Sequence, residues 1–351
     1  MASCTRRWFL ILTITAVTSG CGTSPPPAGS GSTTGGGPAE GNPAADSVKG
    51  TPAKKFRIAM IPKGATHDFW LSVRAGAQKA ADELGTVQIL WDAPISESDK
   101  DVQVNLVDGF INDQVDAICL APIDREGMVP VVRRAKDAGI PTLIFDSALA
   151  DPSLSISYVA TDNYHGGVLA GEHMVKLLNG KGNVILLRYQ EGSESTEQRE
   201  QAFLDTIKKS PEIVVISDEQ RVTTDSVEAV RVSSSLLVTH GDNVNGVFTV
   251  CESLNKGMLK ALQDKQLAGK VRFIAFDSDP QLVDAMKNGQ IDGIVLQDPV
   301  RMGYDSVKTM VAHLEGKPVE KLIPTGEALA TPENMSEPRM QELLFPAKYR
   351  D

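Results

Sequence analysis

The chain has 351 residues, a formal net charge of −10 and 41% hydrophobic residues. This composition is normal for a globular protein, and the length allows two domains. The acidic balance argues against nucleic acid as a partner, because phosphate backbones require a basic face and the sequence has no Lys/Arg cluster beyond short pairs.

The N-terminus has the pattern of an export signal. In MASCTRRWFLILTITAVTSGC an arginine pair precedes a short apolar run, and small residues follow. The last four letters resemble a bacterial lipobox, although Thr18 stands where leucine is usual. We therefore expect a signal peptide over residues 1–20 and lipidation of Cys21, with ordinary secretion as the alternative. The arginine pair leaves the Sec and twin-arginine routes both open.

The next segment is rich in Gly, Pro, Ser and Thr and cannot bury a core. We expect residues 21–54 to be a disordered, lipid-anchored linker. It would hold the protein at a membrane surface, in the periplasm or on the outside of the cell. No apolar run after the leader approaches the roughly 20 residues that span a bilayer.

After this linker, apolar runs of strand length alternate with helical patterns. The apolar runs lie at 56–61, 87–91, 116–121, 141–145, 156–160, 183–187, 213–217, 246–250, 271–276 and 291–296. The helical patterns lie at 69–84, 99–113, 127–138, 166–179, 196–209, 226–240, 254–266, 279–288 and 300–315. Such alternation predicts an α/β protein with parallel sheets that are covered on both faces.

The strand spacing repeats in the two halves of the chain. Runs beginning at 56, 87 and 116 are about 30 residues apart, as are those beginning at 183, 213 and 246. This weak internal symmetry predicts two similar doubly wound lobes. The carboxyl ends of their strands would face a shared cleft.

The loop KGATHDFW after the first strand combines aromatic and hydrogen-bonding side chains. His67, Phe69 and Trp70 in this loop suit a ligand with both C–H and O–H surface. The alternative is that both rings fill the core under the following helix.

Further candidates follow the other strands, and together they could bind hydroxyl groups. They are Asp146, Arg199, Thr224, Cys251, Asp277 and Gln297. Each has a plainer alternative, since an aspartate after a strand often caps a helix and Arg199 could be a surface charge.

The cysteine pattern favours no metal site or cofactor. Cys119 and Cys251 could form a disulfide in an exported protein, but two separate thiols are favoured. The sequence has no CxxC motif, no Cys/His spacing of metal-binding type and no EF-hand loop.

Six segments in unbroken order resemble type I periplasmic sugar-binding proteins, the ribose-type receptors of ABC importers with a LacI-effector-like fold. They are GAQKAADELG, IPTLIFDS, SYVATDNYHGGVLAGE, QREQAF, FIAFDSDP and IDGIVLQDPVRMGY. The resemblance implies two Rossmann-like lobes joined by a three-strand hinge that close on a sugar. It places the N-terminal lobe at 55–160 plus 298–323, the C-terminal lobe at 161–297 plus 324–331, and a tail, packed on the surface or partly disordered, at 332–351.

The resemblance also implies residue roles. Phe69 and Trp70 would stack on the sugar, and Asp146, Arg199, Asp277 and Gln297 would bind its hydroxyls. The chain departs from the ribose binders at five positions, namely His67, Ala121, Ser147, Thr224 and Cys251, where those proteins have Asn, Asn, Arg, Phe and Asn. We therefore expect a neutral monosaccharide or polyol other than D-ribose.

The function implied by the resemblance is that of a monomeric solute receptor that delivers its ligand to the transmembrane permease subunits of an ABC importer. The alternative is a sugar sensor that presents its closed form to a signalling or chemotaxis partner. We do not expect an enzyme, because no nucleophile elbow, P-loop or zinc signature is present. A repressor is disfavoured because a leader and linker stand where a basic helix-turn-helix would be needed.

Overall fold

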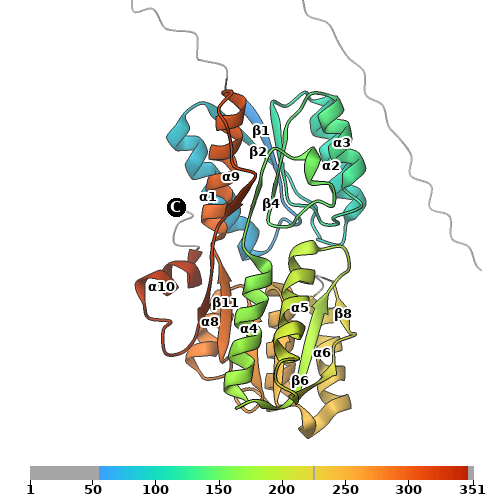
Figure 1. Cartoon of the computed structure of the whole chain (residues 1–351), viewed down its shortest axis with the longest axis vertical. Helices are drawn as coiled ribbons and strands as arrows, with labels where there is room; N and C mark the ends of the chain where they lie inside the picture. Colours follow the sequence, from blue (N-terminus) through green and yellow to red (C-terminus); the bar gives the residue numbers. More distant parts are fainter. Residues whose placement is uncertain (1–54, 224–225, 347–351) are drawn as a thin grey trace, which may run out of the picture. The chain divides into compact units, whose positions relative to one another are not determined.

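The computed structural model describes residues 55–223 and 226–346, all within one compact unit, Pro52–Asp351 (Figure 1). The expected signal peptide, Cys21, the whole of the expected linker at 21–54, Thr224 and residues 347–351 of the expected tail lie outside the described residues. Within these ranges, no helix is both long enough and apolar enough to cross a membrane.

Lobe one is built on a parallel sheet, in which the described strands have the order β12-β5-β4-β3-β1-β2. These strands are β1 (Phe56–Ile61), β2 (Val87–Trp91), β3 (Ala117–Leu120), β4 (Thr142–Phe145), β5 (Tyr158–Ala160) and β12 (Leu322–Pro324). The covering helices are α1 (Asp68–Leu84), α2 (Lys100–Asn112), α3 (Val129–Asp137) and α9 (Pro299–Leu314), with a 3-10 turn at Pro152–Leu154. Strands β3 and β4 are buried throughout, as expected for parallel strands that are covered on both faces.

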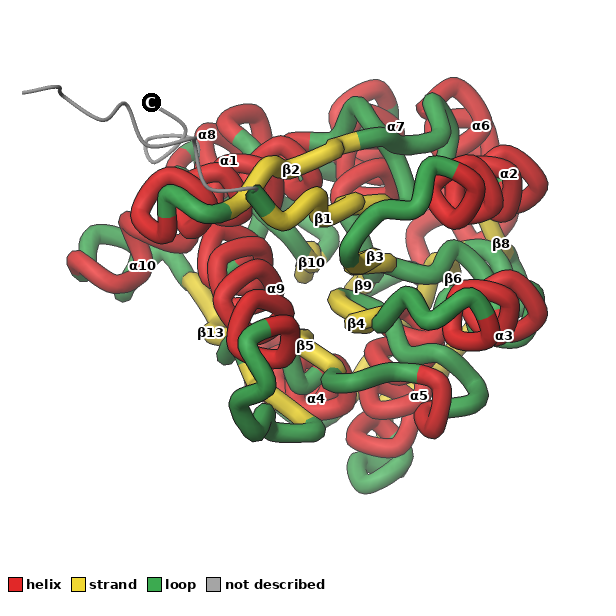
Figure 2. Tube along the Cα trace, turned by 90° about the horizontal axis from the view of Figure 1, so that it is seen from above, coloured by secondary structure: helices red, strands yellow, loops and turns green. Residues whose placement is uncertain are grey.

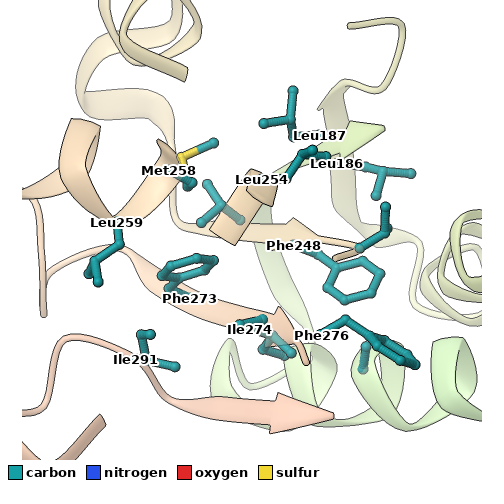
Figure 3. Close-up of a cluster of buried hydrophobic side chains, with 14 of the residues drawn as sticks. Leu186, Leu187, Phe248, Leu254, Met258, Leu259, Phe273, Ile274, Phe276 and Ile291 are labelled. Carbon is teal, nitrogen blue, oxygen red and sulfur yellow. The ribbon is translucent and has the colours of Figure 1, made fainter. Parts of the chain in front are cut away.

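Lobe two is built on a second sheet, in which the described strands have the order β13-β11-β10-β9-β6-β7, while β8 pairs with β6. Its strands are β6 (Lys181–Tyr189), β7 (Glu212–Ser217), β8 (Arg221–Val222), β9 (Gly246–Thr249), β10 (Arg272–Phe276), β11 (Gly293–Gln297) and β13 (Glu327–Ala330). Its helices are α4 (Asn163–Leu177), α5 (Glu194–Ile207), α6 (Ser226–His240), α7 (Glu252–Asp264) and α8 (Pro280–Lys287), with a 3-10 turn at Gly241–Asn243. Figure 3 shows the core of this lobe, where Phe248, Phe273 and Phe276 pack with leucines of β6 and α7.

In the described chain, three segments connect the lobes: β5 to α4, β11 to α9, and β12 to β13. The expectation of an α/β fold with two parallel-sheet lobes is confirmed. One strand differs, because β13 pairs antiparallel with β11. Only two residues separate β12 from β13, and the chain enters the lobe-two sheet beside the last residue of β11. So short a connection cannot reach the opposite end of that sheet, where a strand parallel to β11 would have to begin.

The C-terminal segment, expected to be a surface tail, contains helix α10 (Pro338–Leu344). Its last two residues, Leu343 and Leu344, are buried in the core of lobe two. Ser278 Oγ also donates a hydrogen bond of 2.7 Å to the Leu344 carbonyl. The segment up to Leu344 is therefore part of the folded lobe.

Helices α1 and α9 lie side by side on one face of the lobe-one sheet (Figure 1 and Figure 2). Glycines allow this close approach. A Cβ atom at Gly303 would lie 1.9 Å from the Val73 carbonyl oxygen, and one at Gly76 would lie 1.9 Å from the Val300 carbonyl oxygen. No flexible side chain can move aside at either contact, so any side chain there would push the two helices apart.

We expect Gly303→Ala to lower the free energy of unfolding by about 1–3 kcal/mol or more, as overpacking does. Urea denaturation followed by circular dichroism measures the effect. Gly109→Ala is the matched control, because a Cβ on that exposed face of α2 would meet nothing within 4 Å. The control should be neutral or slightly stabilising, since alanine is the better helix former. Equal stability of the two variants would contradict the close helix contact.

Candidate functional site

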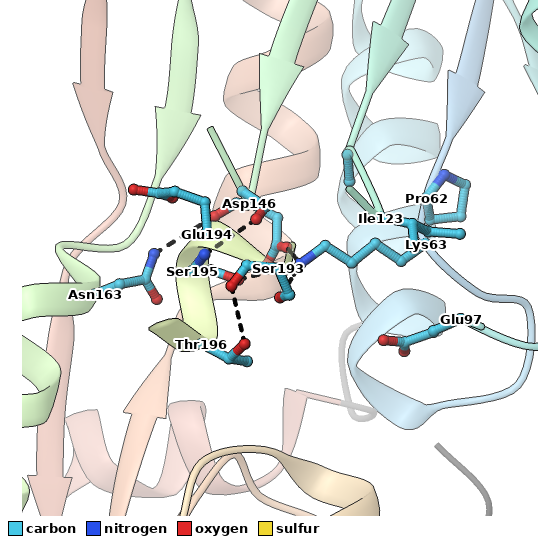
Figure 4. A network of polar contacts seen from close by, with 12 residues as sticks. Pro62, Lys63, Glu97, Ile123, Asp146, Asn163, Ser193, Glu194, Ser195 and Thr196 are labelled. Carbon is cyan, nitrogen blue, oxygen red and sulfur yellow. Dashed lines mark hydrogen bonds and ion pairs between the residues drawn. The ribbon is translucent and has the colours of Figure 1, made fainter. Parts of the chain in front are cut away.

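A cavity of about 40 Å³ lies between the carboxyl ends of the two sheets, with walls from both lobes. It is lined by Lys63, His67, Phe69, Trp70, Glu97, Asp146, Tyr189, Ser193, Ser195, Thr196, Arg199, Cys251, Glu252, Asp277 and Gln297. The structure thus brings together every candidate from the sequence that it describes; Thr224 lies outside the described residues. Figure 4 shows the part of this site around Lys63 and Asp146.

The paired aromatic residues Phe69 and Trp70 lie at the start of α1, where one ring faces the cavity and the other packs mainly in the core. Their rings meet edge to face, with centroids 4.8 Å apart. Trp70 is only 3% exposed and also packs edge-on against Phe145, so the alternative that the rings fill the core is correct in part for Trp70. Phe69 is only half-buried and offers its ring to the cavity. The indole Nε1 of Trp70 donates a 2.8 Å hydrogen bond to Glu97 Oε1, which fixes the ring plane.

Lys63 and Asp146 form a buried ion pair inside the cavity. Lys63 Nζ lies 2.9 Å from Asp146 Oδ2, and both side chains are about 4% exposed. The same ammonium donates to the hydroxyls of Ser193, at 3.2 Å, and Ser195, at 3.1 Å, on lobe two. Figure 4 shows the lysine reaching across from the lobe-one strands to these partners. Lys63 therefore contacts both lobes at once.

Lys63 was not predicted as a site residue, although the sequence contains a signal for it. The residue is the first charged one after β1, in the loop that was singled out for His67 and the aromatics. Strand-end position alone would have placed it among the candidates.

His67 and Glu97 form a second charged pair, with His67 Nδ1 2.8 Å from Glu97 Oε1. Burial opposes the charged form of each group, but their hydrogen bond and mutual attraction outweigh it. The pKa of His67 is raised to about 9 and the pKa of Glu97 is lowered to about 2. The pair is therefore ionised across the neutral range.

Arg199 is the centre of the lobe-two wall and is 2% exposed, so it is not a surface charge. Its Nε donates to Asn163 Oδ1 at 2.8 Å, and its NH1 donates to the Val250 carbonyl at 2.9 Å and lies 3.7 Å from Asp277 Oδ2. The guanidinium also stacks on the Phe276 ring, 3.8 Å from its centroid. Four neighbours thus hold one orientation of the arginine.

Asp277 and Gln297 complete this wall. Gln297 Nε2 donates to Asp277 Oδ1 at 2.7 Å, and Gln297 Oε1 accepts from Thr161 Oγ1 at 2.7 Å. Burial outweighs the attraction of Arg199 and the hydrogen bond from Gln297, and it raises the pKa of Asp277 to about 6. Asp277 is therefore a buried acceptor and does not cap a helix; Asp279 caps α8 instead.

In the described part of the chain, Cys119 and Cys251 are separate thiols, as the sequence favoured. Burial raises the pKa of both, that of Cys251 to about 12, so neither is a thiolate at neutral pH. Over the described ranges, no cluster of three or more His, Cys, Asp or Glu residues is arranged to hold a metal ion.

The charges that line the cavity compensate one another. Lys63 pairs with Asp146, His67 with Glu97, and Arg199 with Asp277. Glu252 pairs with Lys256 at 2.7 Å, just outside the cavity. A charged ligand would meet no spare countercharge here, whereas hydroxyl groups would find both donors and acceptors.

Comparisons with known proteins agree with this geometry. A family model described as a periplasmic binding protein domain matches residues 58–318. The D-apiose import binding protein of Paraburkholderia graminis is 28% identical over 78% of this chain and 87% of its own length. The ribose import binding protein of Escherichia coli is 27% identical over 77% of this chain and 88% of its own. A solved ABC transporter solute-binding protein from Agrobacterium vitis, bound with alpha-D-tagatopyranose, has a TM-score of 0.79 and 30% identity, covering 83% of this chain and 99% of that one.

Proposed function

Because the chain belongs to the periplasmic binding protein domain family, a family of binding proteins and not of enzymes, we propose that it is the solute receptor of an ABC importer. It captures a neutral monosaccharide or polyol between its lobes and delivers it to membrane permease subunits. The names of its curated relatives, which are import binding proteins for D-apiose and ribose, support the ligand class and the transport role.

The observation that most directly supports an uncharged ligand is the charge balance of the cavity. Each charged side chain of its described lining already has a partner of opposite sign. A carboxylate or phosphate on the ligand would have to be buried without a counterion, which costs several kcal/mol. Asp146 and Asp277 accept hydrogen bonds from ligand hydroxyls, Gln297 can accept or donate them, and the Phe69 ring covers the apolar face of the sugar.

Binding requires the lobes to separate first. The cavity of about 40 Å³ is far smaller than the roughly 300–1,000 Å³ of typical small-molecule sites. The ligand therefore enters an open form and is enclosed by hinge closure. Because each lobe supplies part of the hydrogen-bonding set, the ligand favours the closed form by its higher affinity for it.

The same proposal places the protein in the periplasm or on the cell surface, as a monomer attached to the membrane by a lipid on Cys21. The leader and lipobox-like sequence support this location. Mass spectrometry of the membrane-extracted protein tests it, because a lipidated chain would begin at Cys21. A soluble mature protein with an unmodified N-terminus would contradict the anchor.

A thermal-shift screen tests the ligand class, since a ligand that binds only the folded state raises the melting temperature by mass action. The panel should pair neutral aldoses, ketoses and polyols with the matching sugar acids and sugar phosphates. We expect a shift with one or a few neutral compounds and none with their charged counterparts. Tight and selective binding of D-ribose would contradict the inference drawn from the five departures from the ribose binders.

A further inference from the structure

Glu97 joins the two lobes across the cavity. It lies in the loop after β2, and its Oε2 accepts a 2.7 Å hydrogen bond from the Tyr189 hydroxyl at the end of β6. Its backbone carbonyl accepts a second bond, of 2.7 Å, from Gln190 Nε2. Both donors belong to lobe two, so both bonds exist only while the lobes are closed.

The same carboxylate also organises the lobe-one wall. Its Oε1 accepts from both Trp70 Nε1 and His67 Nδ1, each at 2.8 Å. A carboxylate has about four lone-pair positions, and three are therefore used by the protein itself. Glu97 is 8% exposed, and little of its bonding capacity remains for a ligand.

We propose that Glu97 is a positioning residue that couples lobe closure to the shape of the binding site. It holds the Trp70 ring and the His67 imidazole in place on lobe one. When the lobes close, it also accepts a hydrogen bond from the Tyr189 hydroxyl of lobe two. The Glu97–Tyr189 bond favours the closed form before any ligand is bound. The effect on sugar affinity rests on the proposed function, whereas the effect on closure does not.

Lobe closure has several other contacts between the lobes, among them those of Lys63 with Ser193 and Ser195. Loss of the Glu97–Tyr189 bond should therefore shift the open–closed balance without unfolding either lobe. Hydrogen bonds to a charged group are among the stronger ones. Removing this bond should change the closed-to-open ratio by about tenfold or more.

The test compares Tyr189→Phe with the parent protein by small-angle X-ray scattering in the absence of sugar. This variant keeps the ring and removes only the hydroxyl that donates to Glu97. Tyr304→Phe is the matched control, because the Tyr304 hydroxyl donates to Glu83 Oε2 at 2.6 Å within lobe one, away from the cavity. We expect a larger radius of gyration for Tyr189→Phe only. Identical profiles for the parent and Tyr189→Phe would overturn the proposal.

A second variant tests the positioning role on lobe one. Glu97→Gln keeps the size of the side chain and removes its charge, so NMR titration should find the pKa of His67 well below its parent value of about 9. Sugar affinity should fall by more than tenfold with the fold retained. An unchanged histidine titration and unchanged affinity would overturn the role.

These outcomes separate the two proposals. If the parent binds no neutral sugar, the proposed function fails, while the ligand-free scattering still reports on the Glu97–Tyr189 contact. If the parent binds sugar and Tyr189→Phe matches it in both scattering and affinity, the proposed function stands and the positioning role of Glu97 is wrong.

Discussion

Replacing Arg199 with alanine is expected to abolish sugar binding and to lower the free energy of unfolding by about 3–5 kcal/mol. The variant leaves the buried Asp277 carboxylate without its cation, and the Asn163 and Val250 oxygens without their donor. It also removes the group that stacks on Phe276. Without the attraction of Arg199, burial should raise the pKa of Asp277 further above about 6, so that it becomes neutral at physiological pH.

Urea denaturation and calorimetric titration with the ligand measure the two effects. Arg199→Lys is the matched control, because it keeps the charge near Asp277 but cannot bond to Asn163 and Val250 in the same fork or stack equally on Phe276. We expect it to recover much of the stability and only part of the affinity. Parent-like binding by Arg199→Ala would show that the lobe-two wall has been assigned wrongly.

The second large effect is expected for Asp146→Ala, which should weaken sugar binding by well over tenfold. The aspartate lies at the end of β4 and is the charged partner of the buried Lys63 ammonium. Its removal eliminates an acceptor for ligand hydroxyls and leaves the buried ammonium of Lys63 without its partner of opposite charge. Calorimetric titration measures the affinity, and thermal denaturation measures the accompanying loss of stability.

Two further variants isolate the cause. Asp108→Ala removes a partly exposed aspartate of the same lobe that pairs with Arg134 away from the cavity; it should leave sugar affinity unchanged and lower the free energy of unfolding by no more than about 1 kcal/mol. In the double variant Lys63→Met/Asp146→Ala both charges are absent. Stability should return toward the parent value while binding stays weak, because breaking a buried pair costs more than removing it whole. A double variant as unstable as the single one would contradict this explanation.

Much of the fold was predictable because the signals are local. Buried parallel strands are nearly continuous apolar runs, and the repeat of strand and helix implies doubly wound lobes. The resemblance placed a segment of lobe two at 324–331, but the antiparallel pairing of β13 in that segment and helix α10 were not predicted. The antiparallel pairing of β13 depends on a short connection from β12, and α10 is fixed by the burial of two leucines in a core that is distant in sequence.

The lining of the candidate site was predictable where a residue follows its own strand, as with His67, Asp146 and Asp277. Glu97 and Tyr189 were missed because their roles depend on each other. They are 92 positions apart and meet only across the closed lobes. The burial of Arg199 has the same origin, because its partners come from α4 and the end of β9, far from its own helix. No pattern within a single segment shows such contacts.

We expect the charge-balanced cavity between the two closing lobes to bind a neutral sugar or polyol. Isothermal titration calorimetry with a neutral compound from the screen and with its matching sugar acid tests this claim most directly. We expect saturable one-to-one binding of the neutral compound and no measurable binding of the acid. Equal or tighter binding of the acid, or no binding of any neutral sugar or polyol by the folded protein, would contradict it.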